Sequence, residues 1–288
     1  MTLEAHTHFL NVETPEGPRR IAWECWHAHG MEQAPVLICV HGLTRNRHDF
    51  DLIAKAMSDH YRVVTVDILG RGDSDRLAAP EHYGYPLYIS QMLQLLKHIA
   101  EATGEQRFDW LGTSMGGLIG MMIAASPGSP IERLIMNDIG PFIPLKGLTR
   151  LSDYVGRDPA FSTMAEAEEY LRLILSGFGR LTEEQWQHMA RYSVATGADG
   201  YLRLRYDPAI ASAFEGLSED VDLWAVWDAV SCPVLVLQGE ESDLLDSGTV
   251  ARMCEKPSVI SRAFAQCGHA PALMSDDQIQ CVRDFLVM

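Results

Sequence analysis

Long apolar runs are absent from this sequence, and none approaches the ~18 residues that a membrane-spanning helix needs. The N-terminal stretch from Met1 to His6 has no basic region followed by an apolar one, so it does not resemble a secretory signal. Basic residues are scarce, because 23 Lys and Arg stand against 39 Asp and Glu and give a formal charge of -16. Such a charge repels nucleic acids and anionic membrane surfaces. We therefore expect a cytoplasmic protein without nucleic-acid or membrane partners.

Metal and cofactor signatures are also missing. The six cysteines are scattered without metal-binding or redox spacing: Cys25, Cys39, Cys232, Cys254, Cys267 and Cys281. The pairs His6 with His8 and His27 with His29 alternate along expected strands, but no further ligands complete a site near either pair. Buried free thiols are the ordinary state of such cysteines. The sequence predicts neither a metal nor a cofactor.

What the sequence does contain is an alternation of strand-like and helix-like segments. With 47% hydrophobic and 22% charged residues over 288 positions, the chain can bury a large core. A hairpin is expected at 7–12 and 19–29. Strands are then expected at 36–40, 62–68, 107–112 and 131–138, and helices at 50–59 and 87–102. This βαβ alternation predicts an α/β fold with a mostly parallel sheet.

The alternation stops after about residue 141. Between 142 and 219 no strand pattern is evident, and helix-like stretches recur at 145–155, 164–175 and 183–193. Strand patterns resume at 233–239 and 259–265, and a helix at 276–287 closes the chain. We therefore expect a core domain formed by 1–141 and 220–288, with a helical insertion at 142–219. Several aromatic residues of the insertion are candidates to line a pocket, although core packing is the commoner role of each: Phe142, Tyr154, Phe161, Tyr170, Trp186, Tyr192 and Tyr206.

The segment Gly112-Thr113-Ser114-Met115-Gly116 lies between a strand-like run and a helix-like run. A serine on such a sharp strand-to-helix turn sits in strained backbone, and the flanking glycines avoid steric collisions there. Ser114 is thereby exposed at the N-terminus of the helix, where free N–H groups favour developing negative charge. The pattern predicts that Ser114 is a nucleophile and that the Met115 N–H stabilises an oxyanion.

A candidate acid and a candidate base both follow Ser114 in the sequence. His269 lies in the loop after the strand at 259–265, and Asp243 lies just beyond the strand at 233–239. A serine hydroxyl needs an imidazole to take its proton, and the imidazole needs a carboxylate to fix its tautomer. The expected catalytic residues are Ser114, Asp243 and His269.

Other carboxylates are near enough to be considered for the acid. Asp138 follows the preceding strand and is the second candidate for the acid, but by position we expect Asp243. Glu241 is close to Asp243 in sequence. Asp246 is expected to cap a helix that starts near Ser247.

A second oxyanion donor is expected in the loop after the strand at 36–40. This strand runs into His41-Gly42-Leu43-Thr44, which makes the Leu43 N–H the partner of the Met115 N–H. Arg45 follows this loop and either forms an ion pair that holds the loop or binds a substrate carboxylate. We expect the ion pair.

Taken with the turn at 67–74 and the segment Gly268-His269-Ala270-Pro271, these motifs resemble the α/β-hydrolase superfamily over roughly residues 20–288. The resemblance is to cap-containing serine hydrolases of the carboxylesterase or lactonase type. It implies a twisted sheet with helices on both faces, an insertion that caps the pocket, and a His41 side chain that supports the oxyanion loop. Serine at the elbow sets the chain apart from dehalogenases and epoxide hydrolases of this fold, which use Asp.

A serine of this kind forms an acyl-enzyme and transfers the acyl group to water. The expected activity is hydrolysis of the ester of a small or medium-sized, largely apolar substrate. A lactone or carbon–carbon bond hydrolase with the same residues is the alternative, although the oxyanion loop is poorer in glycine than is usual for carbon–carbon bond hydrolases. Outside enzymes, a hydrolase-derived ligand-binding receptor is the alternative. The sequence leaves the oligomeric state, including a homodimer, open.

Overall fold

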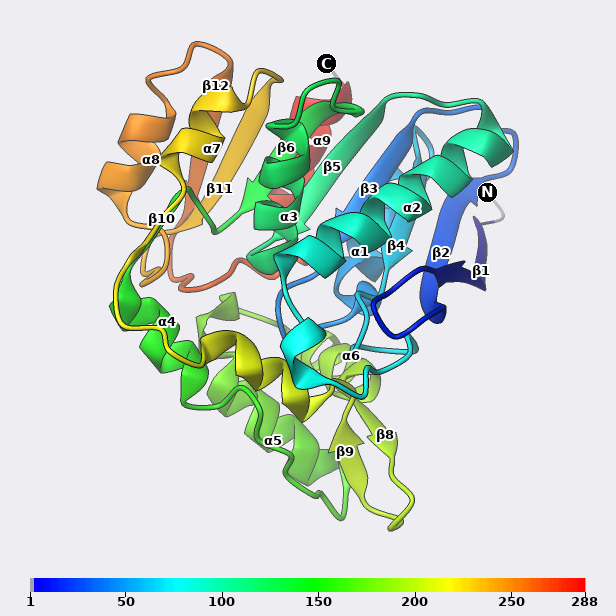
Figure 1. Ribbon diagram of the computed structural model, residues 1–288, viewed down its shortest axis with the longest axis vertical. Helices are drawn as coiled ribbons and strands as arrows, with labels where there is room; N and C mark the ends of the chain where they lie inside the picture. Colours follow the sequence, from blue (N-terminus) through cyan, green and yellow to red (C-terminus); the bar gives the residue numbers. More distant parts are fainter. Residues whose placement is uncertain (1–2, 288) are drawn as a thin grey trace.

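The computed structural model describes residues 3–287, and its centre is an eight-stranded sheet (Figure 1). The strand order is β1 (Leu3–Val12), β2 (Arg19–Ala28), β4 (Arg62–Val66), β3 (Val36–Val40), β5 (Phe108–Thr113), β6 (Ile131–Asn137), β11 (Val234–Gly239) and β12 (Val259–Phe264). The pairs from β4 to β12 are parallel, while β1 and β2 form an antiparallel hairpin that joins β4 antiparallel. This confirms the predicted α/β fold.

The strands β3 and β4 are buried along their whole length, as expected for a sheet covered on both faces. Alternate residues of β3 enter two different apolar layers: Val36, Ile38 and Val40 face one, whereas Leu37 and Cys39 face the other. Burial of each large aliphatic side chain stabilises the fold by about 1.5–3 kcal/mol. The alternation of the strand therefore builds two hydrophobic cores from one segment.

Helices fill both layers. On the side of Val36 lie α2 (Tyr85–Thr103), α3 (Met115–Ala124), α7 (Trp224–Ala229) and α8 (Ser247–Met253), and on the side of Leu37 lie α1 (Asp51–Met57) and α9 (Asp276–Val287). Short 3-10 turns η1 (Arg47–Phe50) and η2 (Pro80–His82) precede α1 and α2. Asp246 accepts a hydrogen bond from the Thr249 N–H at 2.8 Å and caps α8, as predicted.

The parallel register brings the carboxyl ends of the central strands to one edge of the sheet. Thr113 of β5 pairs with Asn137 of β6, and Asn137 pairs with Leu237 of β11. The loops that follow these strands therefore start side by side, which is where ligands bind in open α/β sheets.

A long insertion connects β6 to β11 and lies below that edge of the sheet in Figure 1. It comprises β7 (Phe142–Ile143), α4 (Leu145–Ser152), α5 (Met164–Ile174), η3 (Ser176–Phe178), α6 (Glu183–Ser193), β8 (Val194–Thr196), β9 (Leu202–Leu204), η4 (Pro208–Phe214) and β10 (Val221–Asp222). The three predicted helices are present. The expectation that the insertion has no strand is wrong, because β8 pairs with β9 and β7 with β10. Strands of two or three residues are too short to leave an alternating pattern in the sequence.

Within residues 3–287, no helix combines the length and apolarity required to cross a membrane.

Candidate active site

The turn between β5 and α3 places Ser114 at the carboxyl edge of the sheet. Ser114 has φ 51° and ψ -115°, a conformation that side-chain-bearing residues rarely adopt. A Cβ at Gly112 would collide with the backbone of Gly116, and a Cβ at Gly116 would collide with the carbonyl oxygen of Val40. The steric interpretation of both glycines is therefore confirmed.

A continuous chain of hydrogen bonds starts at Ser114. The distance from its Oγ to Nε2 of His269 is 2.9 Å, and that from Nδ1 of His269 to Oδ2 of Asp138 is 2.8 Å. The buried Asp138 carboxylate also accepts hydrogen bonds from the Gly239 N–H at 2.6 Å and from the Ser242 hydroxyl at 2.5 Å. Since a carboxylate only accepts, Nδ1 of His269 is the donor, and Nε2 is left to accept the Ser114 proton.

This arrangement corrects the expected acid, because the structure places Asp138 and not Asp243 against His269. The Asp243 carboxylate instead binds Nε and Nη2 of Arg150 on α4, with an Nη2–Oδ1 distance of 2.8 Å. The hydrogen bond from Arg150 holds the pKa of Asp243 below its ordinary value. The neighbouring Ser242 is the residue of this loop that reaches Asp138.

Backbone geometry explains how Asp138 reaches the histidine. Asp138 has φ 55°, so the chain turns sharply where β6 ends, and its N–H donates to Leu237 of β11 at 2.8 Å. The sequence offers Asp138 only as the second candidate, and the preference for Asp243 rests on its position after a strand. Both residues follow neighbouring parallel strands, and only the backbone path selects one.

Two backbone amides without an acceptor belong to residues near Ser114. Among residues 3–287, the N–H groups of Leu43 and Met115 have no hydrogen-bond acceptor. Both residues line one cavity with Ser114, and a Cβ built at Gly42 would lie 3.8 Å from Cβ of Ser114. Met115 is also the first residue of α3, where the helix dipole favours negative charge. Both residues are thus candidates to donate to an oxyanion formed beside the serine.

His41 fixes the loop that carries Leu43. Its Nδ1 contacts the Gly42 carbonyl oxygen at 2.7 Å, and its Nε2 accepts the Ile68 N–H at 3.0 Å. Complete burial lowers the pKa of His41 to about 3, so the ring is neutral and donates from Nδ1. His41 thus supports the loop structurally, as the family resemblance implied.

Arg45, also near this loop, is held by an ion pair. Its Nη2 lies 2.6 Å from Oδ1 of Asp49, and its Nε lies 3.0 Å from Oδ2. Its Nη1 donates to the Ser193 hydroxyl of α6 at 2.7 Å. The ion pair that we expected for Arg45 is confirmed.

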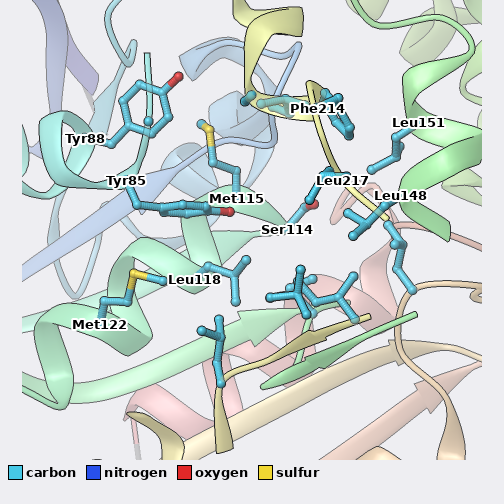
Figure 2. Close-up of a pocket in the computed structure, with 18 of the residues that line it drawn as sticks. Tyr85, Tyr88, Ser114, Met115, Leu118, Met122, Leu148, Leu151, Phe214 and Leu217 are labelled. Carbon is cyan, nitrogen blue, oxygen red and sulfur yellow. The ribbon is translucent and has the colours of Figure 1, made fainter. Parts of the chain in front are cut away.

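An apolar cavity of about 400 Å³ opens beside Ser114 (Figure 2). The insertion and the core both contribute to its wall, which includes Tyr85, Leu118, Met122, Leu148, Phe214 and Leu217. No Asp, Glu, Lys, Arg or His lines it within the part of the chain that the structure describes. Hydrophobic lining with one reactive polar group is typical of a small-molecule site.

A second, smaller cavity of about 40 Å³ also borders Ser114. Its wall includes His269, Thr44, Arg45, Tyr154, Ile174 and Phe178. Of the aromatic residues proposed from the insertion sequence, Tyr154 lines this cavity, whereas Phe161, Trp186 and Tyr206 are buried in the core. Sequence reasoning missed Tyr85, Tyr88 and Phe214, because their approach to Ser114 depends on the tertiary fold.

One group of side chains has the composition of a metal site within the described residues, namely Glu24, His48 and Asp51. Glu24 already accepts from Nε of Arg47 at 3.1 Å, and Nδ1 of His48 lies 3.1 Å from Asp51. These contacts account for all three side chains as ion-pair and hydrogen-bond partners.

The strand order and the Ser–His–Asp hydrogen-bond chain together define an alpha/beta hydrolase. The model of the alpha/beta hydrolase family matches residues 37–280, and the chain belongs to this family.

The relatives of this chain include several hydrolases. A 3-hydroxybutyrate-oligomer hydrolase of Cupriavidus necator is 37% identical, and the match covers 99% of each chain. A pimeloyl-[acyl-carrier protein] methyl ester esterase of Photobacterium profundum is 26% identical over 91% of this chain and 98% of its own. The crystal structure of an alpha/beta hydrolase from Novosphingobium aromaticivorans has a TM-score of 0.88 at 31% identity, covering 100% of this chain and 99% of the other.

The family and the named relatives agree on the kind of reaction. Relatives over nearly the whole chain are named as hydrolases or esterases. The protein is therefore an ester-acting hydrolase, and the enzymatic interpretation replaces that of a ligand-binding receptor.

Proposed function

We propose that this enzyme is a serine esterase that works through an acyl-enzyme, with Ser114 as nucleophile, His269 as general base and Asp138 as the acid that orients His269. The observation that carries the proposal is the pair of contacts of 2.9 Å and 2.8 Å linking the three side chains. Both contacts lie within hydrogen-bond distance, and their order matches the roles that the chemistry needs.

In the proposed reaction, Nε2 of His269 takes the Ser114 proton while Oγ attacks the ester carbonyl carbon. The carbonyl oxygen becomes an oxyanion that accepts hydrogen bonds from the Leu43 and Met115 N–H groups, each contributing about 3 kcal/mol or more. The bond to the alkoxy oxygen then breaks, and His269 gives its proton to the leaving alcohol. Water repeats the sequence on the acyl-enzyme, releases the carboxylic acid and restores Ser114.

We further propose that the insertion at 142–219 acts as a cap. Leu148, Leu151, Phe214 and Leu217 of the insertion line the cavity beside Ser114. A roof of apolar side chains excludes water and strengthens electrostatic interactions at the reacting atoms. The pairing of β7 with β10, which follows the insertion, brings the two ends of this segment together and supports the proposal.

The proposed substrate is the ester of a small or medium-sized, largely apolar acid. The uncharged lining of the 400 Å³ cavity supports this choice, because a charged group would lose its hydration there without gaining a partner. Short 3-hydroxybutyrate oligomers belong on the substrate panel, because the relative that is 37% identical is named for them.

The test of the serine mechanism is Ser114→Ala. We expect a loss of ~10⁴ to 10⁶ in ester turnover with an unchanged thermal melt. A fluorophosphonate should add once, at Ser114, as read by mass spectrometry of the labelled peptide. Ser126→Ala, at an exposed position two residues beyond the end of the same helix, is the matched control and should keep wild-type activity. Near wild-type turnover in Ser114→Ala, or labelling elsewhere, would refute the proposal.

A further inference from the structure

We infer that an ester lies across Ser114 in one orientation, with its acyl chain in the 400 Å³ cavity and its alcohol portion in the 40 Å³ cavity. We name these the acyl cavity and the alcohol cavity. The inference rests on the proposed serine mechanism and adds a substrate class to it. The preferred substrates are esters of medium-length apolar acids with short alcohols.

The position of His269 sets the orientation. The two cavities share Leu43, Ser114 and Leu151, so they meet at the reacting hydroxyl. His269 lines the alcohol cavity and does not line the acyl cavity. A general acid must lie within hydrogen-bond reach of the oxygen that it protonates. The leaving alkoxy oxygen therefore belongs on the side of the alcohol cavity, and the acyl chain takes the other side.

The acyl cavity has the length and lining for an alkyl chain. It follows one face of α3, where Met115, Leu118 and Met122 recur at helical spacing (Figure 2). Met122 is eight residues beyond Ser114, which corresponds to ~12 Å along a helix axis. Tyr88 also lines this cavity, but its hydroxyl already accepts a hydrogen bond from Nη1 of Arg71 at 3.0 Å. The lining thus offers mainly apolar contact to a chain of several methylene groups.

The alcohol cavity is small, and its wall is held in place. A volume of about 40 Å³ holds roughly three water-sized groups. Phe178 of its wall belongs to η3, and backbone hydrogen bonds tie η3 to the loop of His269. The Gly268 N–H donates to Gly177 at 2.8 Å, and the Ala272 N–H donates to Phe178 at 3.2 Å. An alcohol of a few heavy atoms therefore fits within this cavity, and a longer one gains no further enclosed apolar contact there.

Isomeric esters test the orientation without a change in composition. Methyl hexanoate and pentyl acetate share one formula but exchange the long and short sides. Each methylene buried in the acyl cavity should raise kcat/KM about three- to fourfold. We therefore expect methyl hexanoate to exceed pentyl acetate at least tenfold in kcat/KM. Equal values, or a preference for pentyl acetate, would overturn the inference.

Two variants address the cavities separately. Met122→Trp should lower the ratio of kcat/KM for methyl hexanoate over methyl acetate at least tenfold, because the indole fills the far end of the acyl cavity. Leu93→Trp, at an exposed site on α2, is the control and should leave that ratio unchanged. An unchanged ratio in Met122→Trp would overturn the assignment of the acyl cavity.

Ile174→Ala enlarges the alcohol cavity and should raise the ratio of pentyl acetate over methyl hexanoate at least fivefold. Leu173→Ala, at the exposed neighbouring position of α5, should not change it. A lower ratio, or the same ratio, in Ile174→Ala would contradict the assignment. A failure of the orientation leaves turnover and fluorophosphonate labelling at Ser114 intact, whereas a failure of the serine mechanism removes the labelling.

Discussion

Replacing each of the two candidate acids, Asp138 and Asp243, by its amide tests most directly which of them orients His269. In Asp138→Asn, the amide keeps the shape of the side chain but replaces one acceptor oxygen by an NH2 donor. The native carboxylate accepts from His269, Ser242 and the Gly239 N–H, so either orientation of the amide points a donor at a donor. If the NH2 faces His269, the imidazole adopts the wrong tautomer, and Nε2 cannot take the Ser114 proton.

The two substitutions differ strongly in expected size. Loss of the orienting carboxylate lowers kcat by about 10⁴, equivalent to ~5 kcal/mol in the barrier. Asp243 forms a partly exposed ion pair with Arg150, and such pairs contribute about 0–1 kcal/mol. Among the described residues Asp243 makes no hydrogen bond with Ser114 or His269, so Asp243→Asn should lower kcat far less than Asp138→Asn does, and the lost ion pair should lower the free energy of unfolding by no more than about 1 kcal/mol.

The assay is steady-state hydrolysis of a short-chain ester by both variants, with thermal melts to confirm that each is folded. The two variants are matched, because each replaces one carboxylate near the same histidine by its isosteric amide. A larger loss in Asp243→Asn than in Asp138→Asn would refute the assignment of Asp138. A similar, small loss in both would refute the need for an orienting acid.

Two further predictions concern stability. Gly116→Ala should lower the free energy of unfolding in urea by about 2 kcal/mol or more, because the new Cβ collides with the Val40 carbonyl oxygen. At Gly128, which has φ 72° and open space around it, substitution by Ala should lower the free energy of unfolding by only about 1 kcal/mol. Equal losses in the two variants would contradict the steric argument. Burial lowers the pKa of His41 to about 3, so between pH 6.5 and pH 3 the unfolded chain binds a proton that the folded chain does not, and stability falls as the pH falls. His41→Asn should therefore flatten the slope of unfolding free energy against pH by up to about 1.4 kcal/mol per unit between pH 6 and 4, and an unchanged slope would show that His41 is not the group responsible.

Features that depend on local sterics were predictable from the amino-acid sequence. The alternation of strands and helices follows from the period of the apolar residues, and the closing helix at 276–287 coincides with α9. The turn at Ser114 was predictable because only glycine fits at Gly112 and Gly116. The positions of Ser114 and His269 were predictable too, because each lies directly after an expected strand of the parallel sheet.

The acid required information that no local pattern contains. Asp138 and Asp243 both follow strands of the parallel sheet, and the sequence position favoured Asp243, which the structure shows to be wrong. The choice depends on the turn at φ 55° that directs Asp138 toward His269, and on Arg150 of the insertion, which binds Asp243. Long-range contacts of this kind form only when the whole chain has folded. For the same reason Tyr85 and Phe214, which are far apart in sequence, come to line one cavity with Ser114.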